Sequence, residues 1–117
     1  MNRVSGLGRR PAGPVTREDG TRLHVLDSGG TGAALLLLHG LAGYAGEWAQ
    51  VAERLAAACR VVAFDQRGHG SSTRRPADLS RTAHVDDVVA VADALGLERF
   101  TLVGQSMGAH TALLAAA

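Results

Sequence analysis

The sequence predicts an α/β fold in which a mostly parallel sheet, preceded by an N-terminal antiparallel hairpin, carries flanking helices. Two patterns favour this fold. Short continuous apolar segments recur along the chain, as in strands that are covered on both faces. Segments with helical spacing of apolar residues separate them, so neighbouring strands are expected to run parallel.

The hairpin is expected at the start of the folded part. Residues 15–17 and 21–26 flank the turn Glu18-Asp19-Gly20, and an Asp-Gly pair between alternating segments is a strong hairpin signal. Residues 1–14 contain arginines and glycines but no apolar stretch, which favours a flexible leader over an export signal. One domain is therefore expected over residues 15–117, with no internal repeat.

Three later apolar segments are the expected parallel strands. They cover residues 33–38, residues 60–64 with the β-branched pair Val61-Val62, and residues 100–103. The last strand would lie at an exposed edge of the sheet with both faces apolar. Self-association of the chain through that edge is therefore one expected outcome.

Helices are expected between these strands and after the last one. The first covers residues 47–58, the second lies between the N-cap Ser80 and Gly96, and the third covers residues 107–117. Apolar stripes are expected in the first two: Trp48, Val51, Ala52 and Leu55 in one, and Val85, Val88, Val89, Ala92 and Leu95 in the other.

Composition and charge exclude several classes of function. The formal net charge is +1 with both signs interspersed, so no nucleic-acid partner is expected. No group of His, Cys and carboxylate residues has ligand spacing, so neither a metal nor a cofactor is expected. Gln105, Ser106 and His110 interrupt the uncharged segment 100–117, so no membrane association is expected. The single Cys59 suits a reducing compartment, and a cytoplasmic location is expected.

The segment Gly104-Gln105-Ser106-Met107-Gly108 is the most informative motif of the chain. Gly-x-Ser-x-Gly is typical of a sharp strand-to-helix turn that exposes a nucleophilic serine, and the predicted strand and helix supply that context. Its outer glycines let the strand and the helix approach closely. The turn would aim the amide of Met107 at a substrate carbonyl oxygen, beside the partial positive charge of the helix N-terminus.

A second turn, His39-Gly40, follows the strand at residues 33–38 directly. It can place the backbone amide of Leu41 next to that of Met107, so that the two form an oxyanion hole. Each such donor is typically worth roughly 3 to 4 kcal/mol of transition-state stabilisation. A tight loop without catalytic duty is the alternative interpretation.

Together, three motifs resemble those of the α/β-hydrolase-fold family, in its order and at its spacing. They are His39-Gly40, residues 65–71 (Asp-Gln-Arg-Gly-His-Gly-Ser) and residues 104–108, and the resemblance covers about residues 21–117. The middle motif resembles a structural loop of the family. The resemblance therefore implies structural rather than catalytic roles for His39, Gly40, Asp65, Arg67, Gly68, Gly104 and Gly108.

For function, the resemblance implies a serine hydrolase with Ser106 as nucleophile and the amides of Leu41 and Met107 as oxyanion hole. It implies ester, thioester, lactone or related acyl chemistry through an acyl-enzyme, with a small-molecule acyl substrate. Relatives that open epoxides or cleave carbon–halogen bonds carry Asp as nucleophile, so Ser106 argues against those activities.

The chain departs from the family in length. The acid and the histidine of the family's triad follow the nucleophile helix, and this sequence has no matching position for either. A truncated hydrolase that is inactive or nearly so alone is therefore expected. His39 and His69 are expected to brace loops, His110 to point away from the serine hydroxyl, and His24 and His84 to be solvated. Of the aspartates, Asp65 is expected to brace a loop, and Asp86, Asp87 and Asp93 to be exposed on a helix.

Two other functions remain open at this stage. One is a non-catalytic ligand-binding or regulatory protein on the same fold, since a fold does not fix a function. The other is a small domain that assembles a site by homodimerisation, although no histidine of a second copy is a suitable base. Neither the substrate nor the choice between hydrolysis and acyl transfer follows from the sequence.

Overall fold

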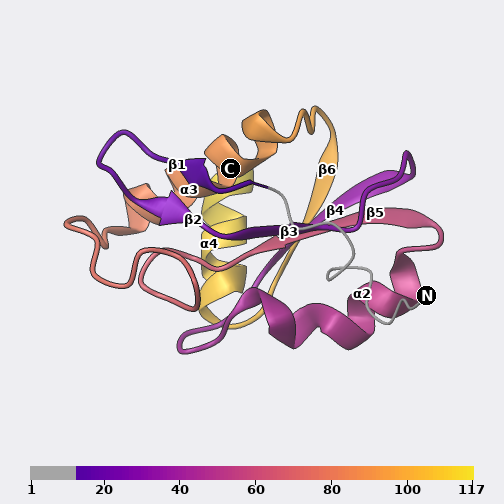
Figure 1. The fold of residues 1–117 in the computed structure, drawn as a ribbon, viewed down its shortest axis with the longest axis horizontal. Coiled ribbons are helices and arrows are strands. Elements are labelled where there is room, and N and C mark those ends of the chain that lie inside the picture. The colour runs from indigo at the N-terminus through magenta and orange to yellow at the C-terminus, as the bar shows by residue number, and fades with distance from the viewer. Residues whose placement is uncertain (1–12) are drawn as a thin grey trace.

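The computed structural model describes residues 13–117, which form a mixed sheet flanked by helices (Figure 1). Residues 1–12, most of the predicted leader, lie outside the described residues. The strands are β1 (Val15–Thr16), β2 (Arg22–Leu23), β3 (Val25–Asp27), β4 (Ala33–Leu38), β5 (Cys59–Phe64) and β6 (Phe100–Gly104). The helices are the 3-10 helix η1 (Ala45–Trp48), α2 (Ala49–Leu55), α3 (Arg81–Ala94) and α4 (Met107–Ala116). None of these helices has the length and apolar character that crossing a membrane requires.

The main sheet has the strand order β3-β5-β4-β6. Strand β4 runs parallel to both of its neighbours, with Leu36 opposite Val62 of β5 and opposite Leu102 of β6. Strand β3 pairs with β5 in the antiparallel direction and forms one edge. The predicted α/β fold with a mostly parallel sheet is therefore confirmed.

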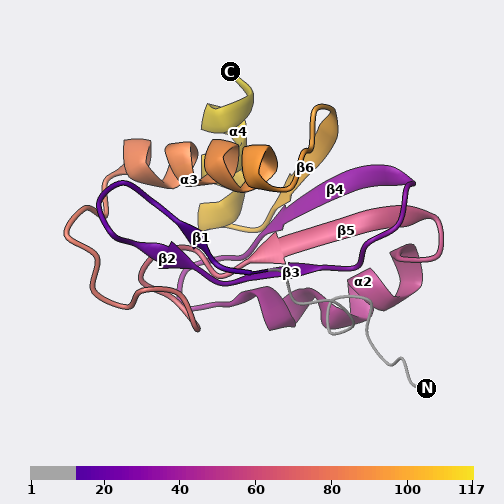
Figure 2. The same ribbon diagram turned by 45° about the horizontal axis from the view of Figure 1, so that its top comes forward.

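Helices cover both faces of this sheet. Figure 2 shows α3 and α4 on one side and α2 on the other. Leu36 and Leu38 belong to the core cluster that contains Val88 of α3, whereas Leu37 belongs to the cluster that contains Ala52 of α2. Because successive residues of a strand point to opposite faces, a strand covered on both sides needs a continuous apolar run.

The predicted hairpin exists, but its second strand is divided. Strands β1 and β2 pair antiparallel with Val15 opposite Leu23, in a separate two-stranded sheet, and Gly20 takes a φ of +89° in the turn. At the half-buried His24 the chain leaves this hairpin, because the backbone N–H of His24 donates to Ser72 Oγ at 2.8 Å. The following residues form β3 and join the main sheet instead.

The helix predicted at residues 47–58 is shorter and begins differently. A 3-10 turn, η1, precedes α2, and α2 ends at Leu55. Val51 was expected on the buried stripe, yet it is 41% exposed, whereas Ala52 is fully buried. A 3-10 helix has three residues per turn, whereas an α-helix has 3.6. The apolar spacing counted from Trp48 therefore does not continue unchanged into α2.

Helix α3 has the predicted ends but a rotated buried face. The Ser80 hydroxyl accepts from the Ala83 N–H at 3.1 Å, and Gly96 has a φ of +71° just beyond the helix. Val89, expected in the core, is 49% exposed. The buried residues are Ala83, His84, Asp87, Val88, Val91 and Ala92. The predictions that His84 and Asp87 are solvated are therefore wrong, because both side chains are buried and form hydrogen bonds within the protein. Asp86 and Asp93 are exposed, as predicted.

Strand β6 forms the other edge of the described sheet, as predicted, because it pairs with β4 alone. Thr101 is exposed, and the other residues of β6 are half-buried. On the neighbouring helix α4, Leu113 and Leu114 are exposed as well. Self-association through this edge stays a prediction.

Candidate active site

Residues 104–108, which we call the serine turn, connect β6 to α4. Ser106 has φ 55° and ψ −115°, and only Ala42 shares a positive φ with it among the described non-glycine residues. A backbone of this kind costs roughly 1–3 kcal/mol and is concentrated at functional sites. The side chain of Ser106 is exposed and does not cap α4, so its hydroxyl is not tied to the helix that follows.

The glycines of the serine turn are required by the close approach of other backbone segments. A Cβ on Gly104 would collide with the carbonyl group of Gly108. A Cβ on Gly108 would lie 2.6 Å from the carbonyl oxygen of His39, at the end of β4. A Cβ on Gly40 would lie 3.3 Å from the carbonyl oxygen of Gln105, so the loop after β4 packs directly on the serine turn.

Leu41 and Met107 both line one cavity of about 580 Å³. Met107 is the first residue of α4, and the first N–H groups of a helix have no acceptor inside it. Leu41 lies in the turn after β4, outside every helix and strand. Neither amide donates to another described residue in the turns and caps of the chain. Both amides are therefore without a hydrogen-bond acceptor within the described residues.

His39 holds the peptide group that carries the Leu41 amide. Its side chain is fully buried, and its Nε2 accepts a hydrogen bond from the Gln66 N–H at 2.9 Å. The ring proton is therefore on Nδ1, which donates to the Gly40 carbonyl at 2.7 Å. Burial lowers the pKa of His39 below its usual 6.5 and favours this neutral form. Because a peptide group is planar, fixing the Gly40 carbonyl also fixes the direction of the Leu41 N–H.

Asp65 joins two loops at the carboxyl end of β5. Its Oδ1 accepts from the Ala45 N–H at 2.6 Å, and its Oδ2 accepts from the Ser71 N–H at 2.8 Å. Gly70 lies so close to this carboxylate that a Cβ there would clash with it, and Gly68 takes a φ of +84° in the same turn. The carboxylate of Asp65 thus supports the loops around the cavity.

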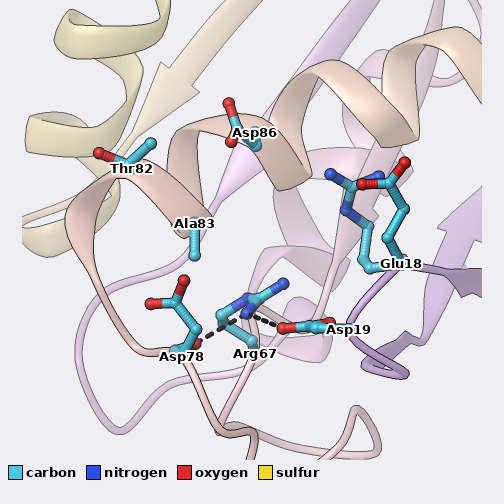
Figure 3. Close-up of a pocket in the computed structure, with 8 residues that line it drawn as sticks. Glu18, Asp19, Arg67, Asp78, Thr82, Ala83 and Asp86 are labelled. Carbon is cyan, nitrogen blue, oxygen red and sulfur yellow. Dashed lines mark hydrogen bonds and ion pairs between the residues drawn. The ribbon is translucent and has the colours of Figure 1, made fainter.

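Arg67 lies at the centre of a buried ionic cluster on the other side of this loop, which we call the Arg67 cluster. Its Nε and Nη2 donate to both oxygens of Asp87 at 2.7 and 2.9 Å, and these two residues are 2% and 1% exposed. Its Nη1 donates to Asp19 at 2.9 Å and to the Asp78 carbonyl at 2.7 Å, beside a cavity of about 160 Å³ (Figure 3). Arg17 adds a second contact to Asp87 at 3.1 Å.

The charges in the Arg67 cluster stabilise one another. Hydrogen bonds to Asp87, followed by those to Asp19, raise the pKa of Arg67 above its usual value. Hydrogen bonds from Thr21 and then Arg67 lower the pKa of Asp19 to about 2. The cluster joins the hairpin, the loop after β5 and α3 at neutral pH, and it supplies no group to the serine turn.

No side chain of the described residues forms a hydrogen bond with the Ser106 hydroxyl. The imidazole of His39 is committed to Gly40 and Gln66, and its ring centroid lies 4.9 Å from that of His69. His110 is exposed on α4, and only its backbone N–H contacts Ser106, through the carbonyl oxygen at 3.1 Å. Within residues 13–117 no group of three or more His, Cys, Asp or Glu side chains could hold a metal ion.

Sequence reasoning missed the buried polar residues of α3. Arg81, His84 and Asp87 repeat at intervals of three residues, which places them on one helix face. In the structure Arg81 and His84 line the 580 Å³ cavity, and Asp87 binds Arg67. The available signal was the position of these polar residues on the same helix face as the apolar Val91, which indicates that the polar face is buried.

Comparison with known proteins agrees with this geometry. Residues 33–117 match the family described as the alpha/beta hydrolase fold. The match covers well over half of the chain and includes β4, the loop after β5 and the serine turn. The chain therefore belongs to the α/β-hydrolase-fold family.

Its relatives catalyse different reactions. The chain is 42% identical over 107 residues to N-formylmaleamate deformylase of Pseudomonas putida, covering 91% of the chain and 40% of the relative. It is 42% identical over 88 residues to fluoroacetate dehalogenase of a Burkholderia species, covering 71% and 29%. A membrane phospholipase A superposes with a TM-score of 0.82 at 31% identity, covering 97% of the chain and 36% of that protein. The chain thus spans at most about two fifths of the length of these relatives. Membership of this family supports a hydrolase.

Proposed function

We propose that the complete protein containing this chain is a serine hydrolase in which Ser106 attacks the acyl carbon of an ester, thioester or lactone. The observation that carries the proposal is the strained backbone of Ser106, at a strand-to-helix junction whose glycines are required by close backbone contacts. A hydroxyl that is exposed at such a point, next to two free amides, suits nucleophilic attack.

The proposed reaction has two stages. Ser106 Oγ forms a bond to the acyl carbon, its proton passes to a base, and the carbonyl oxygen becomes an oxyanion that the Leu41 and Met107 amides stabilise. The oxyanion collapses, the leaving group departs with the proton, and an acyl-enzyme remains. Water then releases the acid by the same route. The base and its orienting acid come from residues outside 13–117, so residues 13–117 alone are not expected to turn over.

The identity of the nucleophile separates this reaction from those of some relatives. The chain resembles a deformylase and a dehalogenase equally in percentage identity. A serine alkoxide attached to an acyl group leaves readily when water attacks the carbonyl carbon, whereas an alkyl ether formed by displacing a halide has no such route. Ser106 therefore favours acyl substrates.

The test is labelling of the complete protein with a fluorophosphonate probe, which phosphonylates activated serines. We expect labelling of the wild type, and loss of labelling together with a fall in kcat of roughly 10⁶-fold in Ser106→Ala. Ser71→Ala is the matched control, because Ser71 is also exposed and contributes its backbone N–H, not its hydroxyl, to Asp65. Full labelling of Ser106→Ala would overturn the proposal.

A further inference from the structure

The cavity beside the candidate oxyanion amides has two arginines in its lining and no carboxylate. Besides Leu41 and Met107, its lining includes Arg74, Arg81 and the two histidines 69 and 84, and it includes no Asp or Glu. Of these, Arg81 and His84 come from α3, on the side of the sheet that also carries α4 (Figure 2). Basic side chains without an acidic partner in a concave site indicate a ligand of negative charge.

Arg81 differs from the other half-buried or buried arginines of the described chain. Arg17, Arg60 and Arg67 each pair with an aspartate, whereas Arg81 pairs with none. Its Nη1 donates to Thr111 Oγ1 at 2.9 Å, and Thr111 is fully buried in α4. The guanidinium is thus held in place by a neutral group, and within residues 13–117 no carboxylate pairs with its charge. A partly desolvated charge of this kind is costly unless a counter-charge arrives.

The free edge of Arg81 matches a carboxylate. With Nη1 bound to Thr111, the Nε and Nη2 donors remain available. Arg67 presents this same edge to Asp87, and Arg60 presents it to Asp27, each with two hydrogen bonds. Paired donors of this geometry bind carboxylates better than single-point cations do.

His84 supplies a second, independent observation. Its side chain is 95% buried, since 5% of its surface remains exposed, yet it lines the cavity. Its Nδ1 lies 2.9 Å from the Ser80 carbonyl, and because a carbonyl only accepts, Nδ1 carries a proton. Nε2 has no hydrogen-bond partner in the described chain. This nitrogen lies one helical turn from Arg81, and as an acceptor it can receive a hydrogen bond from a donor group of a ligand in this cavity.

We propose that the substrate is an acyl compound that carries a carboxylate, which binds the Nε–Nη2 edge of Arg81. This inference rests on the proposed function, because it places the acyl carbon of the same molecule at Ser106. The free carboxylate thereby orients the acyl group toward the Leu41 and Met107 amides, and the apolar side chains of Leu41 and Met107 contact the carbons between them.

The first experiment compares two esters of the same chain length on the complete protein. Mono-p-nitrophenyl succinate carries a terminal carboxylate, and p-nitrophenyl butyrate carries a methyl group in its place. We expect kcat/KM to be roughly 10- to 100-fold higher for the succinate ester, the usual contribution of a hydrogen-bonded charge. In Arg81→Gln this ratio falls to about one through a higher KM for the succinate ester.

Two further variants separate charge from geometry. Arg81→Lys keeps the charge but not the paired donors, so it restores a part of the ratio. Arg75→Gln removes an exposed arginine of the same loop region that does not line the cavity, so the ratio is unchanged. A wild-type ratio near one, or an unchanged ratio in Arg81→Gln, would overturn the inference while hydrolysis of both esters still supported the proposed function.

The second experiment measures binding without turnover. Titration of the complete Ser106→Ala protein with monomethyl succinate is expected to give saturable binding that is at least about 10-fold weaker in Arg81→Gln. Methyl butyrate is the neutral control. Absence of succinate binding overturns the inference even if the esterase is active. Binding without esterase activity supports the inference and counts against the proposed function. If inorganic phosphate bound as tightly as monomethyl succinate, the cavity would bind anions without selecting carboxylates, and the inference would be overturned.

Discussion

The serine turn and the Arg67 cluster differ in whether their polar groups have hydrogen-bond partners within the protein. In the Arg67 cluster, the guanidinium of Arg67 donates four hydrogen bonds, to Asp87, Asp19 and the Asp78 carbonyl, and Arg67 and Asp87 are almost wholly shielded from solvent. At the serine turn, the exposed Ser106 stands on a strained backbone, and the neighbouring Met107 lines a cavity together with Leu41 of the loop after β4. Saturated polar groups hold elements together, whereas unsaturated ones that the fold keeps in place are available to a substrate.

The two regions are nevertheless mechanically connected. The strand β5 and the loop that follows it carry Asp65 and Arg67 two residues apart, with Asp65 facing the loops of the cavity and Arg67 facing α3. Helix α3 in turn presents Asp87 to Arg67 and presents Arg81 and His84 to the cavity. Removal of a contact in the Arg67 cluster should therefore lower stability first and affect the serine turn only through the position of α3.

The largest change in stability is expected from Asp87→Ala. The substitution leaves the buried guanidinium of Arg67 without its main counter-charge, and breaking a buried pair in this way costs about 3–5 kcal/mol. Urea unfolding of the complete protein measures the loss. Asp86→Ala is the matched control, because Asp86 is the exposed neighbour in the same helix and should change stability by less than about 0.5 kcal/mol. Equal midpoints for the two variants would show that the Arg67 cluster contributes little.

A smaller loss of stability and a large loss of activity are expected from Gly108→Ala. The added Cβ meets the carbonyl groups of Leu38 and His39 at the end of β4, and overpacking of this kind costs roughly 1–3 kcal/mol. Relief of the clash has to move the serine turn away from the Leu41 amide, so fluorophosphonate labelling should fall strongly. Gly13→Ala is the control, since a Cβ there meets no atom within 4 Å. Full labelling of Gly108→Ala would mean that the turn tolerates displacement.

These two variants also mark how far the sequence alone could lead. The serine turn was predictable because backbone geometry dictates its glycines locally, and residues 104–108 carry that requirement in five consecutive letters. Asp87 was not, because its partner Arg67 lies 20 residues away and helical spacing shows only which residues share a face. The same limit applied to Val89: its apolar character suggested burial, but Asp87 and Val88 lie on the inner face of α3, and Val89 is 49% exposed. Long-range ionic pairing has no local signature that outweighs apolar periodicity.

The smallest expected effect is a dependence of stability on pH, which should come from His39 next to the serine turn and not from the Arg67 cluster. The folded pKa of His39 is lowered by burial, so between that value and about 6.5 the unfolded chain binds a proton that the folded chain does not. Stability contributed by neutral His39 is therefore complete above pH 6.5 and declines as the pH falls, by at most about 1.4 kcal/mol per pH unit. Arg67 stays charged throughout this window because its pKa is raised, so the Arg67 cluster contributes no such slope.

The measurement is the free energy of unfolding of the complete protein between pH 5 and 7, for the wild type and for His39→Gln. The variant should be less stable at pH 7, because it loses the hydrogen bonds to Gly40 and Gln66, and its stability should depend less on pH. Since His39 also fixes the direction of the Leu41 amide, kcat should fall in the variant more than KM rises. If both proteins had the same pH slope, His39 would titrate normally in the fold, and the clamp on the Gly40–Leu41 peptide would be weaker than its buried geometry indicates.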